Sequence, residues 1–245
     1  RKALLTKQID IENEIRGTLR VFGLKLSGRI QHAVFEQRTL ELLADYPRLA
    51  PIVQPMLIAR AALRDQCAVL HRMLLQLIRK DEVCRRLMTI PGVGALTAIT
   101  FVTTVDDPAR FERSRDVGPH LGLTPRKYAS GEVDRNGAIS KCGDGLCRTT
   151  LYQASLSLLT RTKRWSSLKA WGMSVAKRRG LRRAVVAVAR KLAIIMHRIW
   201  TDGTEFHWSR EDATALRRGR RAPPRRRTVV REDEVGVTAL QPLCT

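Results

Sequence analysis

Apolar side chains recur along most of this chain with the 3.6-residue period of an α-helix. The first such stretch, residues 2–22, places four of them on one face: Ile11, Ile15, Leu19 and Phe22. Gly23 is expected to end this helix, and residues 31–45 are predicted to form a second one. The chain is therefore predicted to begin as a series of amphipathic helices.

The longest predicted helix runs from Pro51 to Arg79 and has apolar side chains at alternating intervals of four and three residues. They are Leu63, Cys67, Leu70, Leu74 and Leu77. A seam with this spacing packs lengthwise against another helix, as in a coiled coil. Its partner is either a helix of the same chain in an antiparallel hairpin or a second copy in a dimer. Residues 1–80 are predicted to form this helical stalk.

Residues 84–104 indicate two helices joined by a tight turn. The sequence IPGVG places Gly92 and Gly94 in the turn, and a helix of small residues follows. This pattern is typical of a helix-hairpin-helix, whose turn amides and helix N-terminus bind a DNA backbone phosphate without reading bases. An ordinary helical hairpin is the alternative. Asp106 and Asp107 are expected to cap helix ends rather than bind metal.

Residues 125–148 differ from the rest because they are rich in glycine and cationic side chains and have almost no apolar content. The cations are Arg126, Lys127, Arg135, Lys141 and Arg148. Glycines permit positive φ and leave their amides open to phosphate oxygens; they are Gly131, Gly137, Gly143 and Gly145. We expect this glycine-rich segment to contact an anion, either as a loop or as a short hairpin about Asp134–Gly137.

Two serines, Ser130 and Ser140, lie within this segment. Ser130 directly precedes Gly131 and follows Arg126 by four residues. If Arg126 and Lys127 neutralise a phosphodiester, the Ser130 hydroxyl is placed to attack its phosphorus. Serines beside glycine in basic loops also make turns or bind phosphate, so the residues alone leave both roles open.

Residues 145–201 contain thirteen Lys and Arg and not one carboxylate. Three helices are predicted, at about 145–162, 165–179 and 181–200. The last has a predicted buried stripe of Val185, Val188, Leu192, Ile195 and Ile199. Off this stripe, three side chains recur every seven residues: Arg183, Arg190 and His197. A helix that is apolar on one side and purely cationic on the other suits a phosphate backbone.

The whole chain of 245 residues has a formal net charge of +22, which favours a nucleic acid as its partner over a membrane. No apolar run could span a bilayer and no signal peptide is visible, so a cytoplasmic protein is expected. Five cysteines without paired CxxC spacing predict reduced thiols and no metal site. They are Cys67, Cys84, Cys142, Cys147 and Cys244.

Beyond residue 208 the helical pattern ends, and eight arginines fall within residues 217–231. This composition predicts a disordered basic tail over residues 209–245. The fold is therefore predicted to be mainly α. A coiled-coil stalk (1–80) is followed by a small helical domain (81–208), which carries the helix-hairpin-helix and the glycine-rich segment.

Several blocks together resemble a known family. They are IPGVG, LGLTPRKYASGEVDRNGAISKCGDGLCRTTLYQAS, AVVAVARKLAIIMHRIW and the opening RKALLTKQIDIENEIRGTLRVFG. Over nearly all of residues 1–207 the chain resembles the C-terminal part of the DEDD-type insertion-sequence transposases. These are the bridge-RNA-guided recombinases, which are similar to Piv-type invertases.

The resemblance implies a DNA transposase in which a RuvC-like domain with four acidic residues binds Mg²⁺ and a separate small domain joins a serine covalently to DNA. Carried over, the SG pair falls on Ser130 and Gly131, so Ser130 is the implied nucleophile. The family's GxISKxG segment also matches this sequence, and the match implies that Ser140 and Lys141 contact the DNA backbone or the transition state. Arg148 matches the arginine that opens the next helix.

The acidic domain has no counterpart here, and the chain begins at Arg1 in mid-helix, so a piece of a longer protein is expected. The resemblance implies that it binds DNA and a structured guide RNA as a homodimer or tetramer in the bacterial nucleoid. It has no cofactor of its own, and it does not recombine DNA unaided. One rival is a non-catalytic nucleic-acid-binding fragment of a decayed element. Another is a helix-hairpin-helix DNA glycosylase, for which Asp106 is the one candidate.

Overall fold

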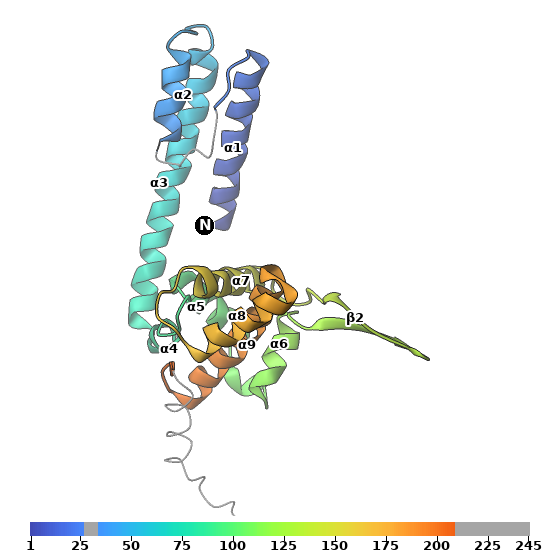
Figure 1. The fold of residues 1–245 in the computed structure, drawn as a ribbon. Coiled ribbons are helices and arrows are strands. Elements are labelled where there is room, and N and C mark those ends of the chain that lie inside the picture. Colours follow the sequence, from blue (N-terminus) through green and yellow to red (C-terminus); the bar gives the residue numbers. More distant parts are fainter. Residues whose placement is uncertain (27–33, 209–245) are drawn as a thin grey trace, which may run out of the picture. The chain divides into compact units, whose positions relative to one another are not determined.

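The fold is that of a computed structural model, which describes residues 1–26 and 34–208. These residues form nine α-helices, two short 3-10 helices and one two-stranded sheet (Figure 1). The predicted mainly helical class is confirmed. The tail predicted over residues 209–245 and the start of the second predicted helix lie outside the described residues.

The first helices are α1 (Lys2–Val21), α2 (Phe35–Leu43) and α3 (Ala50–Lys80). Gly23 ends α1 as predicted, with φ of 75°. The amides of Gly23 and Leu24 bond to the carbonyls of Arg20 and Leu19, which is the Schellman arrangement. Phe22 does not join the buried face; it is 50% exposed, because it stands in the cap where the helix has already ended.

Helices α1 and α3 pack against each other in opposite directions. The buried side chains of α1 are Gln8, Glu12, Ile15 and Leu19, which recur every three or four residues. On α3 the matching buried positions are Val53, Leu57, Arg60 and Cys67. Arg60 lies beside Glu12 and Cys67 beside Arg1, so α3 runs backward along α1. The intrachain hairpin, one of the two predicted arrangements, is therefore present.

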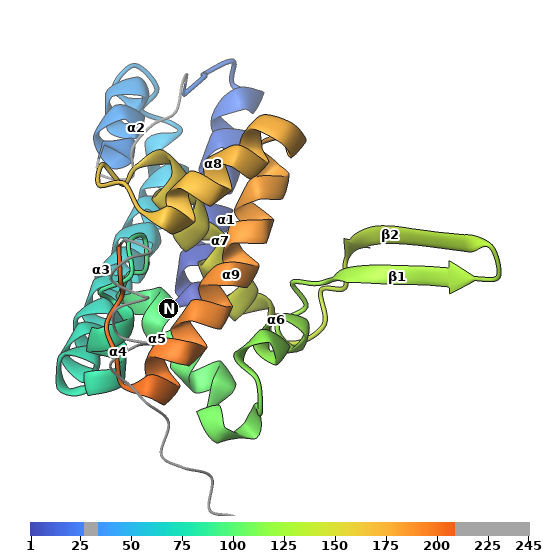
Figure 2. The ribbon, with the colours of Figure 1, turned by 60° about the horizontal axis from the view of Figure 1, so that its bottom comes forward.

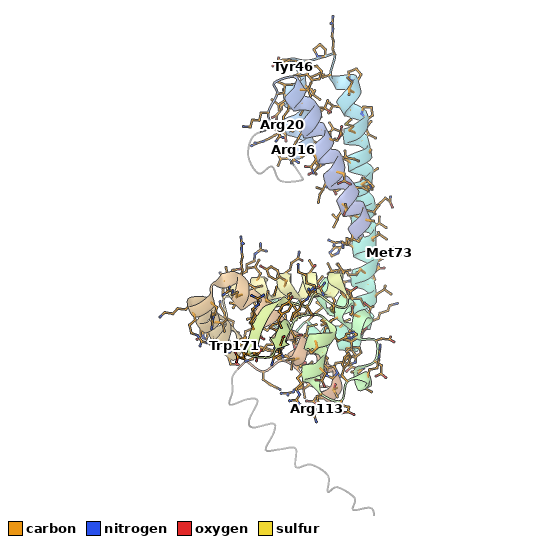
Figure 3. All side chains as sticks on the ribbon, turned by 90° about the vertical axis from the view of Figure 1, so that its right-hand side faces the viewer. Arg16, Arg20, Tyr46, Met73, Arg113 and Trp171 are labelled. Atoms are coloured by element: carbon orange, nitrogen blue, oxygen red, sulfur yellow. The ribbon has the colours of Figure 1, made fainter. Side chains whose placement is uncertain are left out.

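The predicted seam on α3 is wrong in its residues. Of its five members only Cys67 is buried, while Leu70 and Leu77 are 38% and 66% exposed. Contact with α1 reaches Cys67, whose Sγ lies 3.8 Å from the Arg1 carbonyl oxygen. Beyond that level Met73 projects outward and is 54% exposed (Figure 3), whereas Ile78 is buried in the core formed by the later helices.

A buried polar cluster joins these three helices. Arg60 is fully buried, and its Nε donates to the Glu12 carboxylate over 2.8 Å. The guanidinium carbons of Arg16 and Arg60 lie 4.9 and 4.7 Å from the ring centroid of Phe35, which begins α2. A buried ion pair is satisfied only in one alignment, so the cluster favours a single register of the helices.

The remaining helices surround a second core. They are α4 (Glu82–Leu87), α5 (Ala95–Val105), α6 (Val117–His120), α7 (Gly145–Thr160), α8 (Ser167–Arg179) and α9 (Leu181–Asp202). The helices predicted over residues 145–200 are confirmed, and so is the α9 stripe, in which Ile195 is only partly buried. Met196 widens this stripe. Figure 2 shows α9 lying along α8 and α7.

His197 is buried, contrary to its predicted place among the exposed cations of α9. Its Nε2 lies 3.0 Å from the Pro108 carbonyl oxygen and its Nδ1 lies 3.0 Å from the Ser114 Oγ. These partners belong to the 3-10 helices η1 (Pro108–Arg110) and η2 (Ser114–Asp116), which fold over this part of α9. His197 thus holds the connection formed by η1 and η2 against α9. The helical period of the sequence does not predict this contact.

The predicted capping role of Asp107 is confirmed, since its side chain accepts the Ala109 amide over 2.8 Å at the start of η1. Asp106 occupies the C-cap position of α5 with φ of 64°. Asp106 therefore lies at the end of α5, and Asp107 at the start of η1.

Candidate nucleic-acid interface

The serine-containing segment forms a β-hairpin of β1 (Pro125–Ser130) and β2 (Val133–Ile139). It extends away from the helices in Figure 2. The short hairpin allowed by the sequence is confirmed, but its turn lies at Gly131 and Glu132 rather than about Asp134–Gly137. Gly131 supplies φ of 55°, which a two-residue turn needs, whereas Asp134 is paired with Ala129 within the ladder.

The two faces of the hairpin differ in charge. Tyr128 and Arg135 pair across the strands, and the guanidinium carbon of Arg135 lies 5.9 Å from the Tyr128 ring centroid. Because side chains alternate along a strand, Ser130 shares their face. Lys127 lies on the opposite face, 3.9 Å from the Asp134 carboxylate. The serine therefore shares a face with a tyrosine and an arginine.

Arg126 and Ser130 lie toward opposite ends of β1. Four residues of extended strand separate them by about 13 Å. Arg126 stands at the base of the hairpin, where its Nη2 donates to the Ser140 carbonyl over 3.1 Å. Among the described residues the exposed Ser130 hydroxyl has no hydrogen-bond partner.

The base of the hairpin is fastened to the helices by hydrogen bonds to backbone carbonyls. Arg148, on the first turn of α7, donates through Nη1 to the carbonyls of Leu121 and Cys142, over 3.0 and 2.8 Å. The Lys141 amide donates to the Gly122 carbonyl over 3.1 Å and holds Lys141 at φ of 57°, which is unusual for a lysine. Arg148 and Lys141, both predicted to contact nucleic acid, thus also shape this junction.

Two of the four glycines predicted to face phosphate are required by packing. A Cβ on Gly143 would lie 2.0 Å from the His120 carbonyl oxygen, and one on Gly137 would lie 2.6 Å from the Tyr128 ring. Neither Gly137 nor Gly145 has positive φ. Gly131 alone among the four combines positive φ with open space around the missing Cβ, so it is the one that leaves the hairpin tip accessible.

The two turn glycines between α4 and α5 also differ. Gly92 has φ of 86°, and a Cβ there would lie 2.4 Å from the Ala154 carbonyl oxygen on α7, so it serves close packing. Gly94 is exposed at the N-cap of α5, where no side chain caps the first amides. These amides are therefore the part of the turn that is free of side-chain caps and can meet a phosphate.

Several cations of α8 and α9 lie where the two helices meet. Lys177, Arg178 and Arg179 fill the last turn of α8, and Arg183 is exposed on the first turns of α9. Arg190 is also exposed, and its stem lies over Gly118, where a Cβ would approach its Cγ to 3.2 Å. Both predicted arginines of α9 therefore present charge on the surface.

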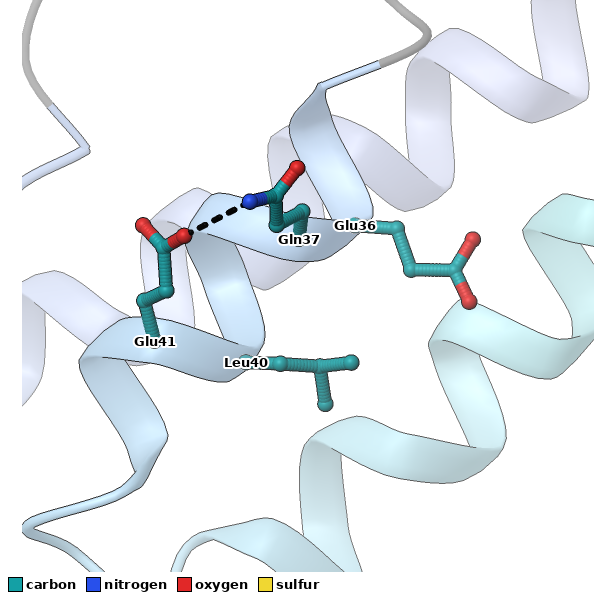
Figure 4. Close-up of a pocket in the computed structure, with 4 residues that line it drawn as sticks. All are labelled: Glu36, Gln37, Leu40 and Glu41. Carbon is teal, nitrogen blue, oxygen red and sulfur yellow. Dashed lines mark hydrogen bonds between the residues drawn. The ribbon is translucent and has the colours of Figure 1, made fainter.

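One hollow of about 410 Å³ lies on α2 and is lined by Glu36, Gln37, Leu40 and Glu41 (Figure 4). Gln37 donates to Glu41 over 3.0 Å. Two carboxylates would repel a phosphate, so this hollow does not belong to the candidate interface.

The described residues contain no group of three or more His, Cys, Asp or Glu side chains that could hold a metal ion. The Mg²⁺ that the resemblance implies therefore finds no ligand set in this part of the chain. Nor does any described helix have the length and hydropathy needed to cross a membrane. Cys142 is exposed, whereas burial raises the pKa of the Cys147 thiol to about 12.

Comparison with known proteins shows that these features resemble those of one family. Residues 84–171, which include the α4–α5 turn, the hairpin and α7, match the family model described as "Transposase IS116/IS110/IS902 family". This part of the chain is therefore similar to the transposases of that family. The sequence-based resemblance to insertion-sequence transposases is confirmed at that level.

Full-length relatives support the same conclusion. The chain is 33% identical over 206 residues to the transposase for insertion sequence element IS1111A of Coxiella burnetii, across 82% of this chain and 56% of that protein. It is 31% identical over 212 residues to the putative transposase y4pF/y4sB of Sinorhizobium fredii, across 84% and 54%. For the transposase of IS1328 from Yersinia enterocolitica the values are 30% over 211 residues, across 84% and 62%. The chain thus matches little more than half of each relative.

Proposed function

We propose that this chain is the part of an insertion-sequence transposase that binds DNA and supplies Ser130 as the nucleophile for strand cleavage and transfer. The observation that carries the proposal is an exposed serine at the tip of a hairpin, within the segment that matches a transposase family. Arg135 and Tyr128 share the serine's face and would contact the backbone of the strand.

The proposed reaction is a transesterification. Ser130 Oγ forms a bond to the phosphorus of a DNA phosphodiester, and the bond from that phosphorus to one sugar oxygen breaks. The departing sugar hydroxyl takes the serine proton, and the serine phosphoester keeps the energy of the broken bond for rejoining to another strand. The Mg²⁺ of the acidic domain implied by the resemblance would stabilise charge on the reacting oxygens.

We further propose that these 245 residues bind nucleic acid but do not recombine it alone. A serine hydroxyl is a weak nucleophile without a neighbouring base, and none contacts Ser130 within the described residues. Because exchange joins two duplexes, the active form would contain at least two copies. A structured guide RNA is the second proposed partner.

The decisive experiment uses the full-length transposase that contains this chain. Wild type should yield a covalent protein–DNA adduct whose peptide includes Ser130, and Ser130→Ala should abolish the adduct while leaving DNA affinity unchanged. Ser174→Ala, which removes another exposed hydroxyl on α8, is the matched control and should retain the adduct.

Two results would overturn the catalytic role. An adduct that maps to another side chain would assign the nucleophile elsewhere. Loss of DNA affinity in parallel with activity in Ser130→Ala would make the serine a phosphate contact, as the non-catalytic rival requires. An adduct formed by the 245-residue chain alone would refute its proposed dependence on a further domain.

A further inference from the structure

An exposed tryptophan stands in the connection between α7 and α8. Trp165 is 61% exposed, although the same ring fully buried in a core would contribute far more to stability. Its neighbours Arg161, Lys163 and Arg164 are exposed as well. An indole ring surrounded by cations on a surface is the combination that binds unpaired nucleotides, because every base has an aromatic face and every nucleotide a phosphate.

The connection holds Trp165 in place before any ligand arrives. The amides of Arg161 and Thr162 both bond to the Ser157 carbonyl, over 2.8 and 3.1 Å. On the other side, the buried Ser166 caps α8 by accepting the Lys169 amide over 3.2 Å. Trp165 therefore projects from a short segment anchored at both ends, which lowers the entropy lost when a base stacks on it.

Lys169 supports the ring from within the protein. This lysine is buried, its ammonium donates to the Thr162 carbonyl, and its Nζ lies 5.3 Å from the Trp165 ring centroid. The cation–π contact orients the indole and adds positive charge behind it. No carboxylate occurs between residues 145 and 201 to offset this charge. The local chemistry favours an electron-rich aromatic ligand that carries phosphate.

We propose that Trp165 stacks on an unpaired base of single-stranded nucleic acid, with Arg161 and Lys163 on the adjoining phosphates. This inference rests on the proposed nucleic-acid binding and deepens it by assigning a surface to unpaired strands. Duplex DNA cannot use the ring, since its bases are already stacked on one another. The surface is thus distinct from the hairpin tip and from the backbone contacts proposed for α9.

The test measures binding of the 245-residue chain to three labelled probes: oligothymidine, an abasic strand of the same length, and a duplex. Trp165→Ala should weaken oligothymidine binding by roughly 5- to 150-fold, the range for loss of one stacked base. Affinity for the abasic strand and the duplex should not change. Trp165→Phe should restore most of the loss, because phenylalanine keeps an aromatic face.

Two further variants separate stacking from other effects. Lys163→Ala should weaken binding to oligothymidine and to the abasic strand alike, since it removes a phosphate contact that both strands make, and should affect the duplex less. Met173→Ala, which trims another exposed apolar side chain on α8, should change none of them. Oligouridine in place of oligothymidine shows whether the site prefers RNA or DNA, and quenching of tryptophan fluorescence that disappears in Trp165→Ala would locate the stacked base.

Equal losses on all probes in Trp165→Ala, or no loss on oligothymidine, would overturn the stacking role while nucleic-acid binding remained. If Trp165→Ala caused no loss on oligothymidine, the exposed ring would be assigned to a protein contact instead. If the wild-type chain bound no probe at all, the proposed function itself would fail.

Discussion

The β-hairpin of residues 125–139 and the helices of residues 145–201 follow each other in the chain but are stabilised in opposite ways. Every residue of β1 is exposed, so the hairpin has no core of its own on that strand. The helices bury a continuous apolar stripe, including Val188, Leu192 and Met196 of α9. The candidate nucleophile thus sits on an element whose conformation depends on contacts at its base. Substitutions at the tip can therefore change chemistry with little effect on folding.

The stretch that includes the hairpin and the helical stretch that follows it also differ in charge. Residues 81–144, which include the hairpin, contain nine Lys and Arg and nine Asp and Glu. Residues 145–201 contain thirteen cations and no carboxylate. Affinity for a polyanion is therefore expected from the helices, while the nearly neutral hairpin is expected to position the serine.

The largest expected difference between the two regions concerns stability. Phe101 is fully buried beside Trp200, so Phe101→Ala should lower the free energy of unfolding by about 3–5 kcal/mol. Tyr128→Ala in the hairpin removes an exposed ring and a cation–π contact worth about 0.5–1 kcal/mol. Chemical denaturation of both variants provides the measurement, and similar losses would contradict the view that the hairpin adds little stability.

A smaller effect is expected at the junction of the two regions. Arg148→Ala leaves the carbonyls of Leu121 and Cys142 without their charged donor, at a cost of about 1–3 kcal/mol. Amide hydrogen exchange should accelerate over residues 121–145 and stay unchanged in α9. Arg161→Ala, at an exposed cation after α7, is the control. Uniform acceleration would mean that the arginine stabilises the whole domain instead.

The buried thiol of Cys147 beside this junction should make stability sensitive to alkali. Burial raises the pKa of Cys147 from 9.0 to about 12, whereas Cys142 is exposed. The unfolded thiol ionises first as pH rises, so the contribution of Cys147 to stability is complete below pH 9 and is lost toward pH 12. Cys147→Ala should flatten the fall in unfolding free energy above pH 9, and Cys142→Ala should not. An equal change in both variants would show that the raised pKa of Cys147 does not cause the fall in stability.

The smallest predicted change is that of a single phosphate contact. Arg183→Ala should reduce the slope of log affinity for DNA against log salt by about 1, across all sequences. Arg20→Ala removes an exposed charge on α1 (Figure 3), outside the cationic helices, and should leave the slope unchanged. Equal slopes for both variants would show that binding charge is not concentrated in residues 145–201.

The sequence by itself determined the helices, because an amphipathic period is a local property that each segment carries. It placed α1, α3 and α7–α9 within a few residues and assigned the buried stripe of α9 correctly. It also contained the blocks that resemble transposases.

Only the tertiary structure decided which partners those elements meet. It buried His197 under η1 and η2, moved the hairpin turn to Gly131, and used Gly92 and Gly143 for close backbone packing. Such contacts join residues far apart in the chain, and no local period encodes them. The period of α3 likewise predicts an apolar face, but which of its residues are buried depends on where α1 and the second core lie beside it.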